Sequence, residues 1–298
     1  MIKTNHKVIP MTYDKIFKSV LESNDTRNYL ISIINEITGI PKEALKNDMR
    51  FKNSEMPVTN VNEKRKILDL IVDIKDCVIN LEMNKYYYEG LVDRNHEYIS
   101  KIRESLIKEG EDYSYLRKVI QINFDDYNMY KPEERAIIKF EMMDETGLKE
   151  GVGVESYHVI LPNVKEKYYN EGVKDGIIGK LVIMMMEDSK ELEKIIKENM
   201  ELRPVGKKIL ELSKDEEMQG WYDEEEHERK VRNSIIATGI RKGWNQAVQE
   251  GKEKGIKEGI KEAKETIAIN MLNRKIDIKM ISDVTGLSED EIEKLKKC

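Results

Sequence analysis

Two adjacent aliphatic runs, separated by a short polar break, constrain the fold of this chain most. Residues 67–74 and 77–84 are rich in β-branched and aliphatic side chains, and only Lys75 and Asp76 lie between them. Two such runs joined by a tight polar turn are typical of a β-hairpin. The aliphatic side chains that flank the polar ones indicate that one side of this hairpin is buried.

The hairpin carries two carboxylates that face each other. With a two-residue turn, Asp69 lies directly opposite Glu82 on one face of the sheet, whereas a three-residue turn would shift this register. Opposed like charges destabilise a sheet, so we expect a cation to neutralise the pair. Carboxylate oxygens are ligands that Mg²⁺ accepts, with water and a phosphate oxygen completing its shell. Asn84 follows on the same face, where it can orient the attacking water or bond a phosphate oxygen.

The segments around the hairpin predict an α/β domain. Apolar residues recur at helical spacing in 16–21, 30–37 and 86–108, while 117–124 and 157–161 have the composition of strands. Helices therefore come before and after the hairpin, and further strands follow. This order is expected of an α/β core.

The chain is long enough for two units and is rich in charge. With 298 residues it exceeds one typical domain, so we expect a globular core plus an appendage. Charged residues make up 36% of the chain, against about a quarter in an average protein. The formal net charge of -6 does not attract polyanions, so contact with a nucleic acid requires a local basic patch or a bound metal.

Neither a secretory signal nor a membrane anchor is indicated by the sequence. Residues 1–10 lack an apolar stretch, and the longest apolar run, 181–186, is far shorter than the roughly 20 residues that span a bilayer. The two cysteines, Cys77 and Cys298, cannot form a disulfide framework or a zinc site of their own. We therefore expect a cytoplasmic protein that binds no membrane.

The second half of the chain is predicted to be helical. Residues 168–212 fit helices that are broken near Gly179 and Pro204. The acidic cluster 223–228 includes His227, and a solvated helix face is favoured there over a metal site.

Small residues recur at every fourth position between 243 and 263. This period aligns them along one slowly drifting stripe of a helix. Glycine in a helix costs about 1 kcal/mol relative to alanine, so the stripe favours close approach to a partner, with a mobile charged linker as the alternative. The stripe comprises Gly243, Ala247, Gly251, Gly255, Gly259 and Ala263.

The C-terminal residues predict a small helix-turn-helix. Residues 276–284 and 288–295 fit two helices, with Ser288 as an N-cap and Glu291 three positions later. The second helix begins with acidic residues that repel phosphates, so packing or oligomerisation is favoured over base recognition. We expect a homo-oligomer assembled through the C-terminal helices.

Three sequence blocks resemble a known family. Residues 13–18 (Tyr-Asp-Lys-Ile-Phe-Lys), 66–69 (Lys-Ile-Leu-Asp) and 79–84 (Ile-Asn-Leu-Glu-Met-Asn) occur in the order and spacing of the Rpn family of recombination-promoting nucleases and transposase-like proteins, within the PD-(D/E)XK nuclease superfamily. Weaker matches follow at 94–98, at 116–120 and in the C-terminal tail. The resemblance therefore covers nearly the whole chain.

This resemblance implies a fold, a metal and a set of site residues. The implied fold is α/β, a restriction-endonuclease-like mixed sheet flanked by helices, with a mainly helical C-terminal region. Asp69 and Glu82 are the implied ligands of Mg²⁺, for which Mn²⁺ substitutes, and Asn84 stands where the family pattern has a catalytic lysine or, in many relatives, Gln. Loss of the lysine removes a cation, so activity is expected to be slow or to need a second metal.

Further candidates are expected around this site. Asp14, Lys18 and Glu55 are secondary candidates, because the first helix of such cores and the following segment often lend a charged group to the site. For Asp14 the alternative is a simple helix N-terminus. Five basic residues are expected to hold DNA phosphates, with surface solubility as the alternative: Lys64, Arg65, Lys66, Lys85 and Arg94.

The sequence therefore predicts a three-part nuclease. Residues 1–165, or a core extending to about 212, form the PD-(D/E)XK domain, 166–240 form a helical region packing on it, and 241–298 form the interaction tail. The predicted activity is Mg²⁺-dependent hydrolysis of DNA phosphodiester bonds, linked to recombination, mobile elements or defence. The alternatives are a catalytically weak or inactive DNA-binding protein and an oligomeric interaction protein on the same fold. No separate Asp/Asp/Glu triad of the integrase kind is present in the sequence, so transposition proper is not expected.

Overall fold

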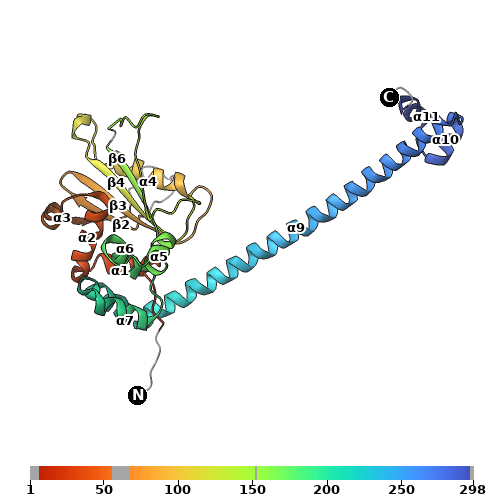
Figure 1. Ribbon diagram of the computed structural model, residues 1–298. Helices are drawn as coiled ribbons and strands as arrows, with labels where there is room; N and C mark the ends of the chain where they lie inside the picture. Colours follow the sequence, from red (N-terminus) through yellow and green to blue (C-terminus); the bar gives the residue numbers. More distant parts are fainter. Residues whose placement is uncertain (1–6, 56–67, 152, 296–298) are drawn as a thin grey trace, which may run out of the picture. The chain divides into compact units, whose positions relative to one another are not determined.

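The chain folds into two units, the first built around a β-sheet and the second helical. The computed structural model describes residues 7–55, 68–151 and 153–295. The first unit is Met1–Tyr222 and the second is Asp223–Cys298. The first unit contains a six-stranded sheet with helices on both faces (Figure 1).

The sheet is mixed, in the strand order β1-β2-β3-β4-β6-β5. Its central strands β3, β4 and β6 are parallel, and the outer pairs are antiparallel. The strands are β1 (Arg50–Lys52), β2 (Leu70–Ile74), β3 (Cys77–Asn84), β4 (Lys118–Asp125), β5 (Ile137–Phe140) and β6 (Val154–Ile160). A mixed sheet flanked by helices confirms the predicted fold class.

The hairpin forms in the predicted register. Leu70 pairs with Leu81 and Ile74 pairs with Cys77, so the turn consists of the two residues between them. Every residue of β3 is buried, because β3 has a strand on each side and helices over both faces. Asp69 and Glu82 come next to the last pair of this ladder, Leu70 and Leu81, with Asp69 just before β2 and Glu82 within β3.

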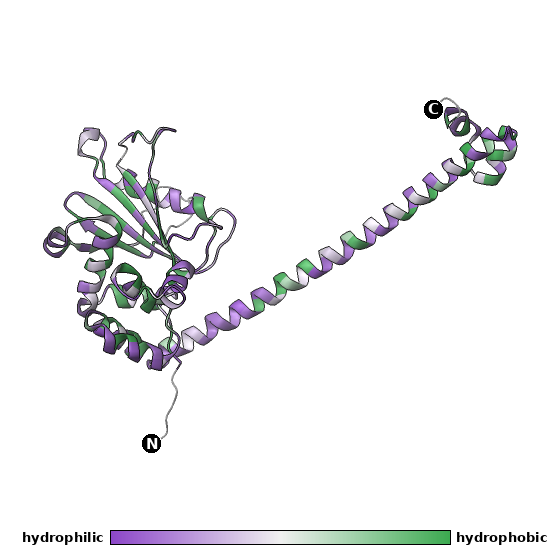
Figure 2. Cartoon of the chain, in the orientation of Figure 1, coloured by the Kyte–Doolittle hydropathy of each residue, from purple (hydrophilic) through white to green (hydrophobic). Residues whose placement is uncertain are grey.

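One face of the sheet carries the main hydrophobic core. Leu81, Ile122 and Phe124 point into this core, and the ring of Phe17 meets that of Phe124 edge-on at 5.5 Å. Figure 2 shows hydrophobic and hydrophilic residues mixed along the strands. The core is closed by α1 (Asp14–Leu21), α2 (Arg27–Thr38), α3 (Lys42–Asp48), α5 (Leu161–Tyr169), α6 (Gly176–Leu181), α7 (Ser189–Glu198) and α8 (Arg203–Leu212), with the short helices η1 (Asn24–Thr26), η3 (Val182–Met185) and η4 (Met200–Leu202) between them.

The opposite face is covered by α4 (Leu91–Ser105). Over one half of this face, Tyr98 and Ile102 of α4 pack on apolar side chains of β2, β3 and β4, such as Val78 and Val119. Over the other half, the strands present polar side chains. Helix α4 covers this face, and the candidate site lies in its polar half.

Several predicted element boundaries were wrong. The helix expected at 86–108 begins only at Leu91, because Gly90 has a positive φ of 86° and ends the preceding loop. Gly179 lies inside α6 rather than at a break. The break predicted near Pro204 is confirmed, because α7 ends at Glu198 and α8 begins at Arg203, with Pro204 in its first turn, where proline is tolerated. The short β1, β5 and α3 had no distinct sequence pattern. The short helix η2 (Tyr113–Tyr115) precedes β4.

The second unit is helical. Helix α9 (Glu216–Asn273) begins in the first unit and continues through most of the second, followed by α10 (Ile278–Thr285) and α11 (Glu289–Leu295). A small core of Ala268, Ile281, Leu287 and Ile292 joins these helices. Among the described residues, no helix has the length and apolar character needed to cross a membrane.

Candidate active site

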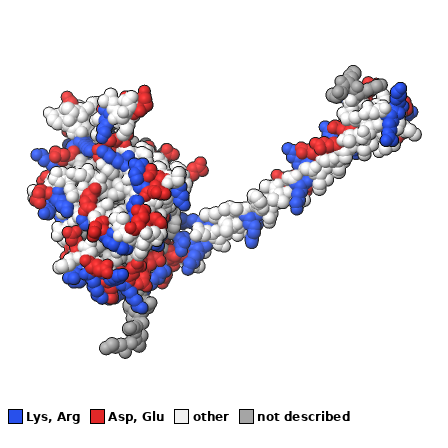
Figure 3. Space-filling view, viewed as in Figure 1, with Lys and Arg blue, Asp and Glu red and all other residues white. Residues whose placement is uncertain are grey.

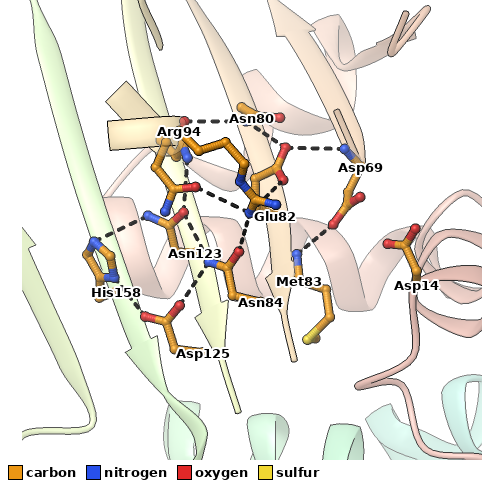
Figure 4. Close-up of polar contacts among 12 residues, drawn as sticks. Asp14, Asp69, Asn80, Glu82, Met83, Asn84, Arg94, Asn123, Asp125 and His158 are labelled. Carbon is orange, nitrogen blue, oxygen red and sulfur yellow. Dashed lines mark hydrogen bonds and ion pairs between the residues drawn. The ribbon is translucent and has the colours of Figure 1, made fainter. Parts of the chain in front are cut away.

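Asp69 and Glu82 meet at the end of the β2-β3 hairpin. The Asp69 N–H donates to Glu82 Oε1 at 3.2 Å, and the Met83 N–H donates to Asp69 Oδ2 at 2.7 Å (Figure 4). Glu82 Oε1 also accepts from Asn80 Nδ2 at 3.1 Å. One oxygen of each carboxylate is therefore held by the hairpin itself, which leaves Asp69 Oδ1 and Glu82 Oε2 for other partners.

Ionisation of both carboxylates in this position is unfavourable in free energy. Burial raises the pKa of Asp69, and the nearby charges of Glu82 and Asp14 raise it further. Burial likewise raises the pKa of Glu82, although hydrogen bonding by Asn80 and the charge of Arg94 oppose the shift. A buried pair of like charges is a frequent property of functional sites, because a bound cation relieves the repulsion.

Helix α1 contributes one acidic and one basic group beside the pair. The ammonium of Lys18 lies 3.4 Å from Asp69 Oδ1 and 3.6 Å from Asp14 Oδ2. Burial lowers the pKa of Lys18, but the two carboxylates outweigh it and the net shift is upward. The structure therefore brings the secondary candidates Asp14 and Lys18 to the site.

Asn84 is held between two partners. Its Nδ2 donates to Asp125 Oδ1 at 2.9 Å, and its Oδ1 accepts from Arg94 Nη2 at 2.6 Å. The same Arg94 nitrogen lies 3.9 Å from Glu82 Oε2. Helix α4 therefore delivers a guanidinium to a position beside Glu82 and Asn84.

Behind these residues lie rows of buried polar side chains on β4 and β6. Gln121 Nε2 donates to Asn123 Oδ1 at 2.9 Å, and Asn123 Nδ2 approaches His158 Nε2 at 3.4 Å. Because a carboxylate oxygen accepts, His158 Nδ1 donates to Asp125 Oδ2 at 2.7 Å. Figure 4 shows these contacts linking the three strands into one network.

The donor atoms fit a hard divalent cation. Two adjacent carboxylates, each with one oxygen that the hairpin does not hold, match the oxygen ligands that Mg²⁺ prefers, and such ions keep several waters rather than a full protein cage. Two buried atoms nearby, Asn80 Oδ1 and Arg94 Nε, have no hydrogen-bond partner among the described residues, which is consistent with a site whose polar groups are completed by water or a ligand. Within the same described part of the chain, no group of three or more His, Cys, Asp or Glu side chains forms a metal site by itself.

The remaining predicted site residues differ in their placement. The Lys85 ammonium donates to Thr12 Oγ1 at 2.9 Å and lies over the ring of Tyr13, so it is already engaged in contacts with the N-terminal segment. Glu55 is exposed, and its N–H donates to Asn53 Oδ1. Lys64, Arg65 and Lys66 lie outside the described residues.

Sequence reasoning missed the polar rows of β4 and β6. Gln121, Asn123 and Asp125 alternate with apolar residues in a strand that is otherwise buried, as do the polar residues of β3. This period of two was visible in the sequence, and it is the signal that could have identified them. His158 offered no such signal. It is one polar residue of β6, and its contact with Asp125 joins two strands that are far apart in the sequence.

The mixed sheet, with an acidic pair at the end of a central hairpin, is the restriction-endonuclease-like arrangement of PD-(D/E)XK nucleases. A family model described as PD-(D/E)XK nuclease family transposase matches residues 11–239, and a second, described as the C-terminal HTH domain of the Rpn/YhgA-like nuclease family, matches residues 261–297. The chain belongs to this Rpn-type family of PD-(D/E)XK transposases, which confirms the resemblance seen in the sequence. No curated protein and no solved structure gives a significant match.

Proposed function

We propose that this protein is a metal-dependent DNA endonuclease that hydrolyses phosphodiester bonds, with Mg²⁺ as cofactor and Mn²⁺ as a substitute. The observation that carries the proposal is the convergence of Asp69, which is largely buried, and Glu82, which is buried, two carboxylates with raised pKa values, beside a partly buried guanidinium. A bound divalent cation would polarise the scissile phosphate and lower the pKa of a water nucleophile. Strand breaks of this kind serve recombination, mobile elements or defence.

Each side chain has a definite task in this proposal. Asp69 and Glu82 hold the cation through the oxygens that the hairpin leaves available. Asn84, fixed by Asp125 and Arg94, is oriented to bond the attacking water or a phosphate oxygen. Lys18 forms ion pairs with Asp69 and Asp14, and its ammonium lies where it would contact a phosphate bound beside these carboxylates.

Arg94 supplies the cation that the missing lysine would have provided. Its guanidinium is always charged and reaches the site from α4, where it can stabilise the negative charge that develops on the phosphate. The Tyr88 and Tyr98 rings lie 5.7 and 5.3 Å from the guanidinium carbon, which restricts its orientation. The asparagine at position 84 is therefore compatible with catalysis.

Cleavage of supercoiled plasmid tests this function. We expect Mg²⁺- or Mn²⁺-dependent cutting by the wild type, its abolition by Asp69→Ala, by Glu82→Ala and by EDTA, and full activity of Asp76→Ala. Asp76 is a matched control because it is an exposed carboxylate at the turn of the same hairpin. Equal cutting by all four proteins would show that the activity belongs to a contaminant.

One observation favours a second candidate, a DNA-binding protein without catalysis. Position 84 carries an uncharged asparagine in place of the family's catalytic lysine, and the formal net charge of the chain is -6. The matched helix-turn-helix at 261–297 would then bind DNA for the whole protein. Binding by the wild type with no cutting in either metal would select this candidate.

We also propose that the three-part organisation expected from the sequence is functional, with residues 1–165 or 1–212 holding the catalytic core and 241–298 serving interaction. The C-terminal helices would assemble a homo-oligomer. This assembly would place more than one catalytic core on one DNA molecule.

A further inference from the structure

The loop between β3 and α4 exposes three consecutive tyrosines. Tyr86, Tyr87 and Tyr88 are 44%, 57% and 47% exposed. They follow Asn84 almost directly in the chain, so they lie at the rim of the candidate site. A group of half-exposed aromatic rings beside a site is unusual in a protein surface and often marks an interaction surface. Flat rings favour a partner that also has flat faces.

Contacts with the site hold this loop in place. The Tyr87 ring packs edge-on against Tyr127 at 5.6 Å, and the Tyr127 hydroxyl donates to Asp125 Oδ1 at 3.2 Å. Tyr88 lies over Arg94, which itself reaches Asn84 and Glu82. The position of the rings is therefore tied to the groups that would hold the scissile phosphate.

The charges around the loop are mixed. Arg94 and Lys85 lie beside the rings, with the Lys85 ammonium 5.8 Å from the centre of the Tyr86 ring, but Glu89 and Asp93 are exposed on the same segment. Basic and acidic side chains are likewise intermingled over the face of the first unit seen in Figure 3. A ligand of this loop therefore gains more from its contact with rings than from its charge.

We propose that Tyr86 and Tyr87 form a stacking surface for unpaired DNA bases next to the cleavage position. The proposal rests on the proposed nuclease function and names its substrate class: single-stranded or locally unpaired DNA. Every base has a flat face that can stack on an aromatic ring, and single-strand binding proteins combine such rings with nearby cations. In a duplex these faces are covered by neighbouring bases, so the rings discriminate between paired and unpaired strands.

The test compares DNA binding by the full chain and by the double variant Tyr86→Ala/Tyr87→Ala. Fluorescence anisotropy is measured in EDTA, which prevents cleavage, with a labelled single strand and with the duplex of the same sequence. We expect the single-strand Kd to rise about tenfold or more, because each base that stacks on a ring contributes to binding, and the duplex Kd to change little. The double variant Tyr86→Phe/Tyr87→Phe should bind like the wild type, because it keeps both faces.

A matched control uses two other exposed tyrosines. Tyr113 and Tyr115 are 80% and 76% exposed and precede β4 at the end of the sheet opposite the site, so their replacement by alanine should leave both Kd values unchanged. Unchanged single-strand binding in Tyr86→Ala/Tyr87→Ala, or equal loss for single strand and duplex, would overturn the proposal.

The stacking surface and the nuclease function can fail separately. If the wild type cuts no DNA but the tyrosine variant loses single-strand binding, the stacking surface stands without the proposed hydrolysis. If the wild type cuts DNA and the variant binds both substrates like the wild type, the hydrolysis stands and the stacking surface is wrong.

Discussion

At the scale of single residues, the buried acidic pair should make stability depend on pH. The folded protein holds protons on Asp69 and Glu82 at pH values where the unfolded chain has lost them, because their pKa values are raised. The free energy of unfolding must then fall as pH rises from the ordinary carboxyl range towards the raised values. A pKa that differs by one between the folded and the unfolded chain changes this free energy by about 1.4 kcal/mol.

We therefore predict that Asp69→Asn stabilises the metal-free protein at alkaline pH. The variant removes one charge and keeps an oxygen to accept from the Met83 N–H. Urea denaturation in EDTA should show a gain of more than about 1 kcal/mol near pH 8 and almost none near pH 4. Asp76→Asn, at the exposed turn, should show no gain at either pH. A variant that is less stable than the wild type at the higher pH would contradict the proposed repulsion.

Arg94 should carry much of the catalytic charge. We predict that Arg94→Ala lowers the single-turnover rate of plasmid nicking about 10²- to 10³-fold, the loss that follows removal of one stabilising donor from a transition state. Arg94→Lys should be intermediate, because an ammonium keeps the charge but not the planar fork. Arg103→Ala, near the C-terminal end of the same helix, serves as the control. A wild-type nicking rate in Arg94→Ala would show that the arginine has no catalytic role and only a structural one.

At the scale of elements, the polar rows of β3, β4 and β6 should act as one unit. Asp125 accepts from both Asn84 and His158, and an asparagine in its place can accept from only one of them. We predict that Asp125→Asn lowers stability by about 1 to 3 kcal/mol, the cost of an unsatisfied buried group, and lowers kcat with little change in KM. Tyr127→Phe removes another hydrogen bond to Asp125 but leaves no buried donor without an acceptor. It should therefore change stability and kcat little.

The same elements show how far the sequence could predict this site. The hairpin register followed from alternation and a two-residue turn, so the pairing of Asp69 with Glu82 was within reach. The approach of Arg94 was not, because it depends on where α4 begins and how it crosses the sheet. The link from Asp125 to His158 depends on the crossover that makes β4 and β6 neighbours, and a single sequence does not reveal strand order.

At the scale of the whole molecule, the catalytic unit should be separable from the C-terminal tail. The sheet, its covering helices and the site all lie within Met1–Tyr222, and the small core of the terminal helices lies within Asp223–Cys298. We predict that a chain truncated before Arg241 folds with the thermal stability of the wild-type core and retains metal-dependent nicking. Light scattering should show a smaller oligomer. Loss of folding would mean that the tail is part of the core.

Assembly should depend on an apolar stripe along α9 rather than on its glycines alone. Ile236, Ile240 and Trp244 follow each other at intervals of four residues and are 52%, 69% and 71% exposed, while a Cβ added to Gly251 or Gly255 would meet nothing within 4 Å. Exposure of such a stripe to water is unfavourable, and its burial against a second apolar helix lowers the free energy.

We therefore predict that Ile240→Glu/Trp244→Glu lowers the oligomeric mass of the full chain measured by sedimentation, because two charges would be buried in the contact. Gln246→Glu is the matched control, because position 246 lies on the opposite side of the helix from 244. If both variants keep the mass of the wild type, α9 is a charged, solvated helix that connects the two units of each chain, and the glycines serve no interface.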